Sequence, residues 1–144
     1  MPTVAPNRMG RRALLRIGLP LLCALALSGC LLSSGERRSS DLGPSSGNEA
    51  VSFIGAEGEQ TYTLKVAGGE LQVIAIVAAS SGELRLDVLD ADGAVALTVQ
   101  SRPDEQVTRS GTVRVSDASG LRYRMVARSA RNGAYQVLYQ QQEP

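Results

Sequence analysis

The strongest constraint on the fold is a two-residue period that begins near residue 60. In residues 60–66 (QTYTLKV) the apolar side chains of Tyr62, Leu64 and Val66 alternate with polar ones. Residues 84–88 (LRLDV), 112–115 (TVRV), 121–125 (LRYRM) and 135–139 (YQVLY) repeat the alternation, and residues 71–77 are apolar on both faces apart from Gln72. Because successive side chains of a strand point to opposite sides of a sheet, this period predicts strands with one buried face.

Short turn-forming segments separate these runs. Glycine or asparagine, which accept a positive φ at low cost, occur within residues 68–69, 80–82, 90–93, 116–120 and 130–133. We expect strands near residues 51–54, 60–66, 71–78, 83–89, 94–100, 105–109, 112–115, 121–127 and 134–140. Strands at this spacing, without an amphipathic helix among them, predict an all-β antiparallel sandwich or barrel over residues 51–144.

An export-signal pattern occupies residues 1–29. Four arginines and no acidic residue precede the apolar run 17–27, which ends in small residues. Small side chains at Ser28 and Gly29 let an extended chain enter a peptidase cleft, and the thiolate of Cys30 is the nearby nucleophile to which a lipid can be attached. The segment resembles the bacterial lipoprotein signal, with Leu27, Ser28, Gly29 and Cys30 at the four positions of its lipobox.

This resemblance implies cleavage before Cys30, a diacylglyceryl thioether on its sulfur and a further acyl chain such as palmitate on its amine. One buried chain gives marginal membrane binding, whereas two or three give durable anchoring. An uncleaved membrane anchor is the alternative, because residues 17–35 carry no charge and approach the roughly 18 apolar residues that span a bilayer. Both interpretations place the rest of the chain outside the cytoplasm.

The expected location is therefore the cell envelope. If the source has an outer membrane, we expect attachment there. Lipoproteins retained at the inner membrane carry aspartate after the lipidated cysteine, whereas here Leu31 follows Cys30. If the source has no outer membrane, we expect attachment to the outer face of the plasma membrane. The pair Arg11-Arg12 also resembles the twin-arginine export signal, so this route and the general secretory route both stay open.

Residues 31–50 are rich in serine, glycine, proline and charge. A segment of this composition cannot bury enough apolar surface to offset its ordering entropy. We therefore expect residues 30–50 to form a lipidated, flexible linker. About 20 residues of such coil span roughly 25 Å, enough to hold a domain clear of the lipid headgroups.

Composition excludes several function classes. After residue 29 the chain has 11 basic and 14 acidic residues, a net charge of −3, so nothing indicates a nucleic-acid partner. Histidine and tryptophan are absent, which removes the commonest general base, the commonest metal ligand and the best stacking platform. Once Cys23 is removed with the signal, Cys30 has no partner for an internal disulfide. We expect no catalytic residues and no enzymatic activity.

Asp90 and Asp92 form the first candidate site. Two carboxylates before Gly93 are typical of the opening of a calcium loop. They are equally typical of a hairpin turn, and the apolar residues 94–97 supply no further ligand. The turn is favoured, and Ca²⁺ is the one cofactor that the sequence leaves open.

A group of outward-facing arginines forms the second candidate site. If their strands are neighbours, these guanidinium groups make a stripe suited to carboxylates, sulfates or lipid headgroups. The alternative, which we favour, is a solvated face paired across strands with Glu83 and Asp87. The arginines are Arg85, Arg114, Arg122 and Arg124.

Tyrosines could supply a sugar-stacking platform, but their parity predicts otherwise. Tyr62, Tyr123, Tyr135 and Tyr139 all share the phase of the apolar positions, so we expect them in the core. The parity of Phe53, which precedes the regular alternation, is ambiguous.

Part of the chain resembles the bacterial pre-peptidase C-terminal domain. The resemblance rests on residues 62–66 (YTLKV), the turn at Gly68-Gly69, residues 84–93 (LRLDVLDADG) and the pair 121–125 and 133–137 (LRYRM, GAYQV). It covers residues 51–140 and implies a small jelly-roll-like β-sandwich. That family's domains accompany secreted enzymes as accessory or carbohydrate- or protein-binding modules.

These observations favour a membrane-anchored extracytoplasmic lipoprotein that acts as a non-catalytic binding or accessory module. Its partners would be the membrane, through the lipid on Cys30, and an envelope protein or a glycan. A first alternative is a structural or assembly lipoprotein that docks on an envelope complex through an exposed strand edge. A second is a hydrolase with an unrecognised carboxylate site.

Overall fold

Residues 30–142, which the computed structural model describes, form eight antiparallel strands. The predicted all-β antiparallel fold is confirmed, and no helix of these residues has the length and apolar character needed to cross a bilayer. The strands are β1 (Leu32–Ser34), β2 (Arg37–Leu42), β3 (Ser46–Leu64), β4 (Gly69–Ala78), β5 (Ser81–Leu89), β6 (Val95–Gln100), β7 (Val107–Val115) and β8 (Leu121–Gln141).

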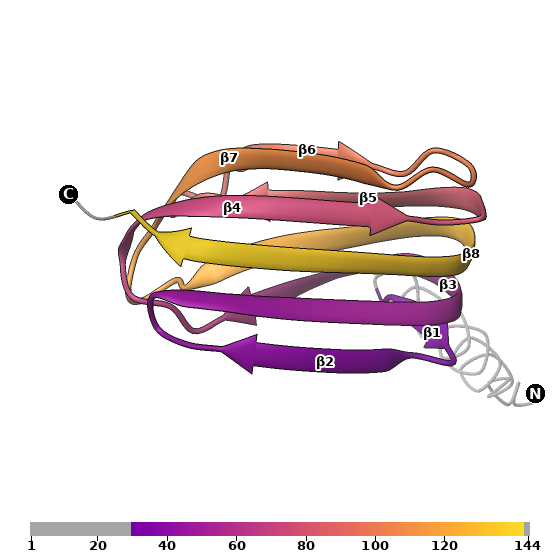
Figure 1. The fold of residues 1–144 in the computed structure, drawn as a ribbon, viewed down its shortest axis with the longest axis horizontal. Coiled ribbons are helices and arrows are strands. Elements are labelled where there is room, and N and C mark those ends of the chain that lie inside the picture. Colours follow the sequence, from indigo (N-terminus) through magenta and orange to yellow (C-terminus); the bar gives the residue numbers. More distant parts are fainter. Residues whose placement is uncertain (1–29, 143–144) are drawn as a thin grey trace, which may run out of the picture.

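The strands belong to one sheet that folds back on itself to make two layers (Figure 1). The long strands β3 and β8 pair with each other along their whole length and run through both layers. The front layer has the order β2-β3-β8-β4-β7, and the back layer has the order β1-β3-β8-β5-β6. The sandwich therefore depends on two strands that bend sharply at the same level.

The bends lie at a register shift between Ala56 and Gly58 of β3, opposite residues 127–130 of β8. Gly58 has a φ of 103°, and Ser129 on β8 has a φ of 49°. The carboxylate of Glu57 accepts a hydrogen bond from the backbone N–H of Ser129 at 2.5 Å, which satisfies a donor that the bulge removes from the ladder. Any Cβ on Gly58 would clash with the carbonyl oxygen of Cys30, so the described chain starts directly against the bend.

The core fills the space between the two layers. Its largest fully buried side chains are Tyr123, Leu71, Leu84, Leu86, Leu121 and Met125. Burial of each such leucine or methionine stabilises the fold by about 1.5–3 kcal/mol. The inward positions expected for Tyr123, Tyr135 and Tyr139 are confirmed, whereas Tyr62 is half-buried.

The prediction of a flexible linker over residues 30–50 is wrong. Residues 32–42 lie in β1 and β2, and β3 begins at Ser46. In β2 the inward positions are Arg38 and Ser40, which pair with Val51 and Glu49 of β3. The two-residue period is present, but its inward side chains are polar, and Arg38 binds Glu49 of β3, so hydropathy does not show the period.

The predicted turn at residues 130–133 is also wrong, because these residues lie inside β8. Asn132 has a positive φ of 44°, but the strand continues, and Gly133 lies opposite Phe53 of β3. The buried Phe53 ring occupies the space that a Cβ on Gly133 would need. Three predicted pairs of strands are therefore single strands: 51–54 with 60–66 is β3, 105–109 with 112–115 is β7, and 121–127 with 134–140 is β8.

Candidate ligand-binding face

The outer surface of the front layer carries almost no charge. Across it, Asn48 of β3 lies opposite Leu138 of β8, which lies opposite Ile74 of β4. Charged residues are confined to its margins, such as Arg37 and Asp41 on the edge strand β2. We call this surface the front face; its residues are Ser46, Asn48, Ala50, Ser52, Gln72, Ile74, Ile76, Ala78, Thr108, Ser110, Thr112, Ala134, Gln136, Leu138 and Gln140.

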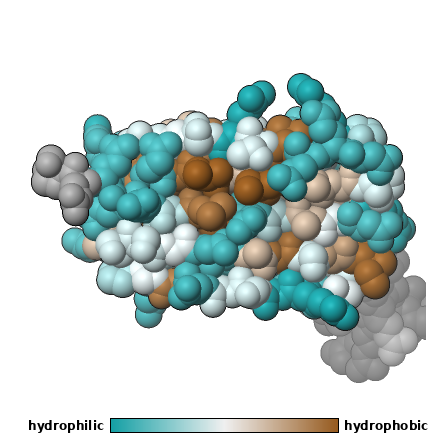
Figure 2. Space-filling model, viewed as in Figure 1, coloured by the Kyte–Doolittle hydropathy of each residue, from teal (hydrophilic) through white to brown (hydrophobic). Residues whose placement is uncertain are grey.

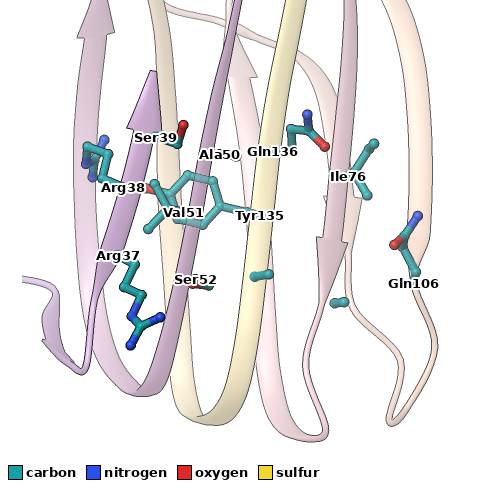
Figure 3. Close-up of a pocket in the computed structure, with 12 residues that line it drawn as sticks. Arg37, Arg38, Ser39, Ala50, Val51, Ser52, Ile76, Gln106, Tyr135 and Gln136 are labelled. Carbon is teal, nitrogen blue, oxygen red and sulfur yellow. Dashed lines mark hydrogen bonds between the residues drawn. The ribbon is translucent and has the colours of Figure 1, made fainter. Parts of the chain in front are cut away.

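A shallow trough follows the strands along the front face. Its first part has a volume of about 320 Å³ and forms where Ala50, Ser52, Ala78 and Ala134 leave space between larger neighbours (Figure 3). Two further hollows of about 520 and 670 Å³ lie nearer the other end of the strands. They share Ser46, Gln72 and Gln140 and are therefore continuous. We call these three hollows the front trough.

Seven amide side chains line the front trough. The Nε2 atom of Gln136 donates to Oδ1 of Asn48 at 2.8 Å, and Nε2 of Gln142 donates to Oε1 of Gln72 at 3.1 Å. Each of these amides keeps further donors or acceptors for a ligand. The side chain of Gln140 makes no hydrogen bond within residues 30–142.

Aliphatic side chains lie between these amides. Ile74 is 37% exposed, and Ile76 and Leu138 are half-buried beside it. Hydrophobic atoms are correspondingly visible in the middle of this surface, between hydrophilic ones (Figure 2). A surface with neutral donors, neutral acceptors and aliphatic patches suits an uncharged ligand that has both hydroxyl or amide groups and apolar C–H surface.

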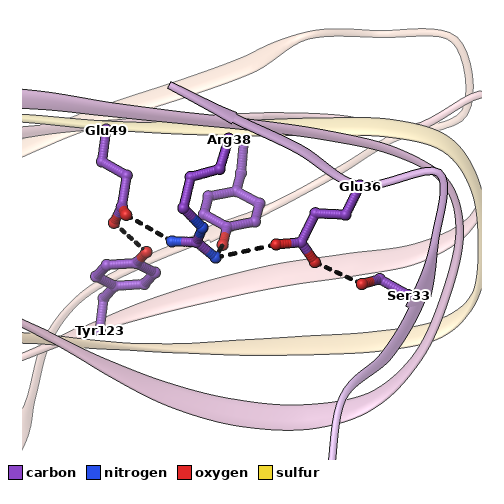
Figure 4. A network of polar contacts seen from close by, with 6 residues as sticks. Ser33, Glu36, Arg38, Glu49 and Tyr123 are labelled. Atoms are coloured by element: carbon purple, nitrogen blue, oxygen red, sulfur yellow. Dashed lines mark hydrogen bonds and ion pairs between the residues drawn. The ribbon is translucent and has the colours of Figure 1, made fainter. Parts of the chain in front are cut away.

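A second polar cluster lies between the layers, beneath β1 and β2 (Figure 4). Glu49 is only 4% exposed; its two oxygens accept hydrogen bonds from Arg38 Nη1 and from the Tyr123 hydroxyl, each at 2.5 Å. Glu36 holds the other side of the same guanidinium at 3.4 Å. The guanidinium also lies over the ring of Tyr62, with 4.8 Å from its Cζ to the ring centroid.

Burial and hydrogen bonding shift the pKa of three groups of this cluster, Arg38, Tyr123 and Tyr135. Burial raises the pKa of Tyr123, and its hydrogen bond to Glu49 raises it further. Burial opposes the charge of Arg38, but the hydrogen bond to Glu49 and the interactions with Tyr135 and Tyr123 together outweigh this and raise its pKa. Burial likewise raises the pKa of Tyr135, whose hydroxyl accepts from Arg38 at 3.4 Å. With both oxygens of Glu49 engaged, the cluster is suited to fixing strands rather than to moving a proton.

The sequence analysis missed this cluster because Glu36, Arg38 and Glu49 all lie in the segment taken for a linker. Parity offered one signal, since Glu49 shares the phase of the apolar residues Val51 and Phe53 on the same strand.

The structure brings three of the four candidate arginines to one surface, the outer side of the back layer. Asp87, 3% exposed, binds Arg124 Nη2 at 2.9 Å and lies 3.3 Å from Arg85 Nε. Arg122 Nη2 donates to the carbonyl oxygen of Asp90 at 3.1 Å. Arg114 lies on β7 in the front layer, opposite Glu70. The pairing with Asp87 follows the favoured interpretation, and no ion pair of Glu83 occurs within residues 30–142.

Asp90 and Asp92 lie in the turn between β5 and β6. Oδ1 of Asp90 accepts hydrogen bonds from the backbone N–H groups of Asp92 and Ala94, at 2.9 and 3.0 Å. This is the geometry of an Asx turn, in which the carboxylate shapes the backbone. Residues 30–142 contain no group of three or more His, Cys, Asp or Glu side chains arranged to hold a metal ion.

Cys30 is exposed at the start of the described chain, and its thiol is free. Leu27, Ser28 and Gly29, the other three lipobox positions, lie outside the described residues, as does the predicted signal peptide.

Comparison with known proteins adds little about function. No protein-family model matches the chain, and no curated protein matches it. Among solved structures, a carbohydrate-binding module of the Cellvibrio mixtus lichenase 5A in complex with cellotriose is 21% identical, with a TM-score of 0.40; the match covers 78% of this chain and 91% of that one.

Two further structures match at a similar level. The C-terminal CBM6 of a Zobellia galactanivorans laminarinase is 16% identical with a TM-score of 0.39, covering 78% of this chain and 98% of that one. The CBM22-1 and GH10 modules of Clostridium thermocellum xylanase 10B are 13% identical with a TM-score of 0.44, covering 79% of this chain and 26% of that one. At these scores and identities the matches give no information about what this chain binds.

Proposed function

We propose that the chain is a lipid-anchored binding module of the cell envelope, without chemistry of its own, and that its front trough binds a neutral polysaccharide. The observation that carries this proposal is the amide-lined trough along the front face, whose charged lining residues, Arg37, Arg38 and Asp41, all lie on the edge strand β2. The lipoprotein signal at Leu27-Ser28-Gly29-Cys30 supports the anchoring.

A neutral, extended ligand fits this trough for three reasons. Amides such as Gln136 and Gln140 can donate and accept at once, which matches sugar hydroxyl groups. Aliphatic residues such as Ile74 can contact the C–H faces of sugar rings. Two hollows of the trough are continuous through Ser46, Gln72 and Gln140, so a polymer can occupy both at a time.

The affinity is expected to be low, because the front face has no aromatic residue on which a sugar ring could stack. We expect a dissociation constant nearer to about 1 mM than to about 1 μM. Multiple weak contacts along a polymer suit a module that holds its ligand next to a membrane surface.

The edges of the front layer favour its face over strand addition as the binding mode. The edge strand β2 carries Arg37 and Asp41, and the edge strand β7 carries Arg109 and Arg114. Charged side chains on edge strands oppose pairing with another chain.

Affinity electrophoresis of the acylated protein in detergent tests this function. Gels would contain a glucan, a xylan, a galactan or, as the charged comparison, a polyuronate. We expect at least one neutral polysaccharide to retard the protein, and the double variant Gln136→Ala, Gln140→Ala to bind about tenfold more weakly, because each lost hydrogen bond contributes about 0.5–1.5 kcal/mol.

The matched control is Thr61→Ala with Thr63→Ala, which removes two hydroxyl groups from the outer side of the back layer and should leave binding unchanged. Retardation by the polyuronate alone, or equal effects of the two double variants, would contradict the proposal. Failure of every polymer to retard the protein would contradict it too.

A further inference from the structure

We infer that the sandwich lies directly on the bilayer, through the end at which β3 and β8 bend. We call this surface the bend end; its key residues are Leu32, Ile54, Arg37, Arg128 and Arg131. The inference deepens the proposed function and rests on its anchoring at Cys30.

The position of Cys30 is the first argument. Leu31 packs against the core, β1 begins at Leu32, and the carbonyl group of Cys30 lies against Gly58 in the bend of β3. No linker therefore separates Cys30 from the domain. Acyl chains on its sulfur and amine, or an uncleaved spanning segment before it, would both enter the membrane at the surface of the sandwich rather than about 25 Å away from it.

Exposed apolar side chains next to Cys30 are the second argument. Leu32 is 63% exposed and Ile54 is 61% exposed, more than any other large hydrophobic residue among residues 30–142. Ile54 packs over Gly35, in the turn between β1 and β2, and Leu32 is two residues from Cys30. Exposed aliphatic side chains beside a lipid anchor gain by entering the headgroup and acyl boundary.

Unpaired positive charge at the same end is the third argument. Arg37, Arg128 and Arg131 form no ion pair within residues 30–142. Arg131 lines a hollow of about 290 Å³ together with Leu32. Guanidinium groups in this position suit the phosphates of anionic lipids.

Most acids of the bend end are already engaged. Glu57 accepts from the backbone of Ser129, Glu36 binds Arg38, and Glu105 pairs with Arg102 at 3.6 Å. Asp104, in the loop between β6 and β7, and Glu83 of β5, opposite Arg128, are acids of this end that form no ion pair within residues 30–142. Arg37, Arg128 and Arg131 are therefore the basic groups of this end that can pair with lipid phosphates.

Fluorescence quenching in vesicles tests the inference with the full acylated chain. The variant Ile54→Cys would be labelled with a bimane fluorophore, since the thioether occupies the sulfur of Cys30. The vesicles would contain phosphatidylcholine, phosphatidylglycerol and a nitroxide-labelled phosphatidylcholine. We expect severalfold stronger quenching at residue 54 than in the matched variant Leu42→Cys, which labels an exposed leucine at the opposite end of the sandwich (Figure 1).

Flotation separates failure of the anchor from failure of the inference. If the unsubstituted protein does not float with the vesicles, or Cys30→Ser floats equally well, the anchoring in the proposed function is wrong. If the protein floats and residue 54 is quenched no more than residue 42, the bend end does not contact the bilayer and the inference is overturned.

The same quenching assay tests the contribution of Arg128 and Arg131. Arg128→Gln with Arg131→Gln should reduce quenching at residue 54 severalfold in vesicles with phosphatidylglycerol, and much less in phosphatidylcholine alone. Equal quenching with and without these substitutions would contradict the role of the two arginines.

Discussion

Two buried carboxylates, Glu49 and Asp87, have similar hydrogen-bond partners but lie in different parts of the sandwich. Each is almost inaccessible, and each accepts from an arginine and from a hydroxyl group: Arg38 and Tyr123 for Glu49, Arg124 and Thr98 for Asp87. Glu49 lies between the layers, whereas Asp87 lies on the outer side of the back layer.

The difference lies in what each carboxylate connects. Asp87 joins neighbouring strands of one layer, because Arg124 and Thr98 are its direct cross-strand partners. Glu49 joins three parts of the molecule: β3 of the front layer, Tyr123 from the back-layer half of β8, and Arg38 from the edge strand β2. The same chemistry therefore serves pairing in one place and cross-layer assembly in the other.

Three predictions test this comparison, and removal of Glu49 should have the largest effect on stability. We expect Glu49→Ala to lower the free energy of unfolding by about 3–5 kcal/mol, because Arg38 loses its buried partner and the Tyr123 hydroxyl loses its acceptor. Urea denaturation measures this change. Limited trypsin digestion should also cut after Arg37 and Arg38 much faster, because β2 loses its inner attachment.

Glu59→Ala is the matched control, since Glu59 lies on the same strand but is exposed, and it should change stability by less than about 0.5 kcal/mol. If Glu49→Ala does not fold, Glu49→Gln retains an acceptor for Tyr123 and should still lose more than the control. Equal effects of the substitutions at residues 49 and 59 would show that the buried cluster does not hold the layers together.

This comparison also shows which parts of the molecule the sequence could predict. The strands β4, β5 and β6 could be predicted because their inward residues, such as Leu84 and Leu86, are apolar. The pairing of Asp87 with Arg124 could be expected because parity places both residues on the outward faces of their strands, where opposite charges on neighbouring strands pair. The N-terminal strands could not be predicted, since Arg38 and Glu49 face inward and hydropathy counts them as solvent-exposed.

The candidate site followed the same division. Outward positions such as Gln136 could be assigned from parity, but the trough requires β3, β8 and β4 to be neighbours, and no local pattern gives that order. Asparagine and glycine at residues 132–133 indicated a chain reversal, whereas in the structure Gly133 accommodates the Phe53 ring within a continuous strand. Local signals thus fixed conformation and parity, while tertiary contacts decided connectivity.

Alkaline pH should weaken the cross-layer cluster selectively. Since burial raises the folded-state pKa of Tyr123 above the ordinary value of about 10, the unfolded chain releases this proton first as the pH rises. Stability is therefore unaffected below about pH 10 and falls above it, by about 1.4 kcal/mol per pH unit for this one group. Urea denaturation of the unsubstituted protein and of Tyr123→Phe across this range should show a shallower decline in the variant. Parallel declines would mean that Tyr123 ionises equally easily in both states.

Removal of the charge of Asp87 should have the smallest effect on stability of the three predictions. Arg85 and Arg124 keep about a third of their side-chain surface exposed, so water can replace the lost carboxylate. We expect Asp87→Asn to lower the free energy of unfolding by about 1–2 kcal/mol, and Arg114→Ala, an exposed change on β7, to alter it by less than about 0.5 kcal/mol. The freed arginines should also bind sulfate more tightly than in the unsubstituted protein, which isothermal titration calorimetry can measure. If Asp87→Asn lost as much free energy of unfolding as Glu49→Ala, the position of the carboxylate between or outside the layers would make no difference. Unchanged sulfate binding would mean that Asp87 does not neutralise these arginines.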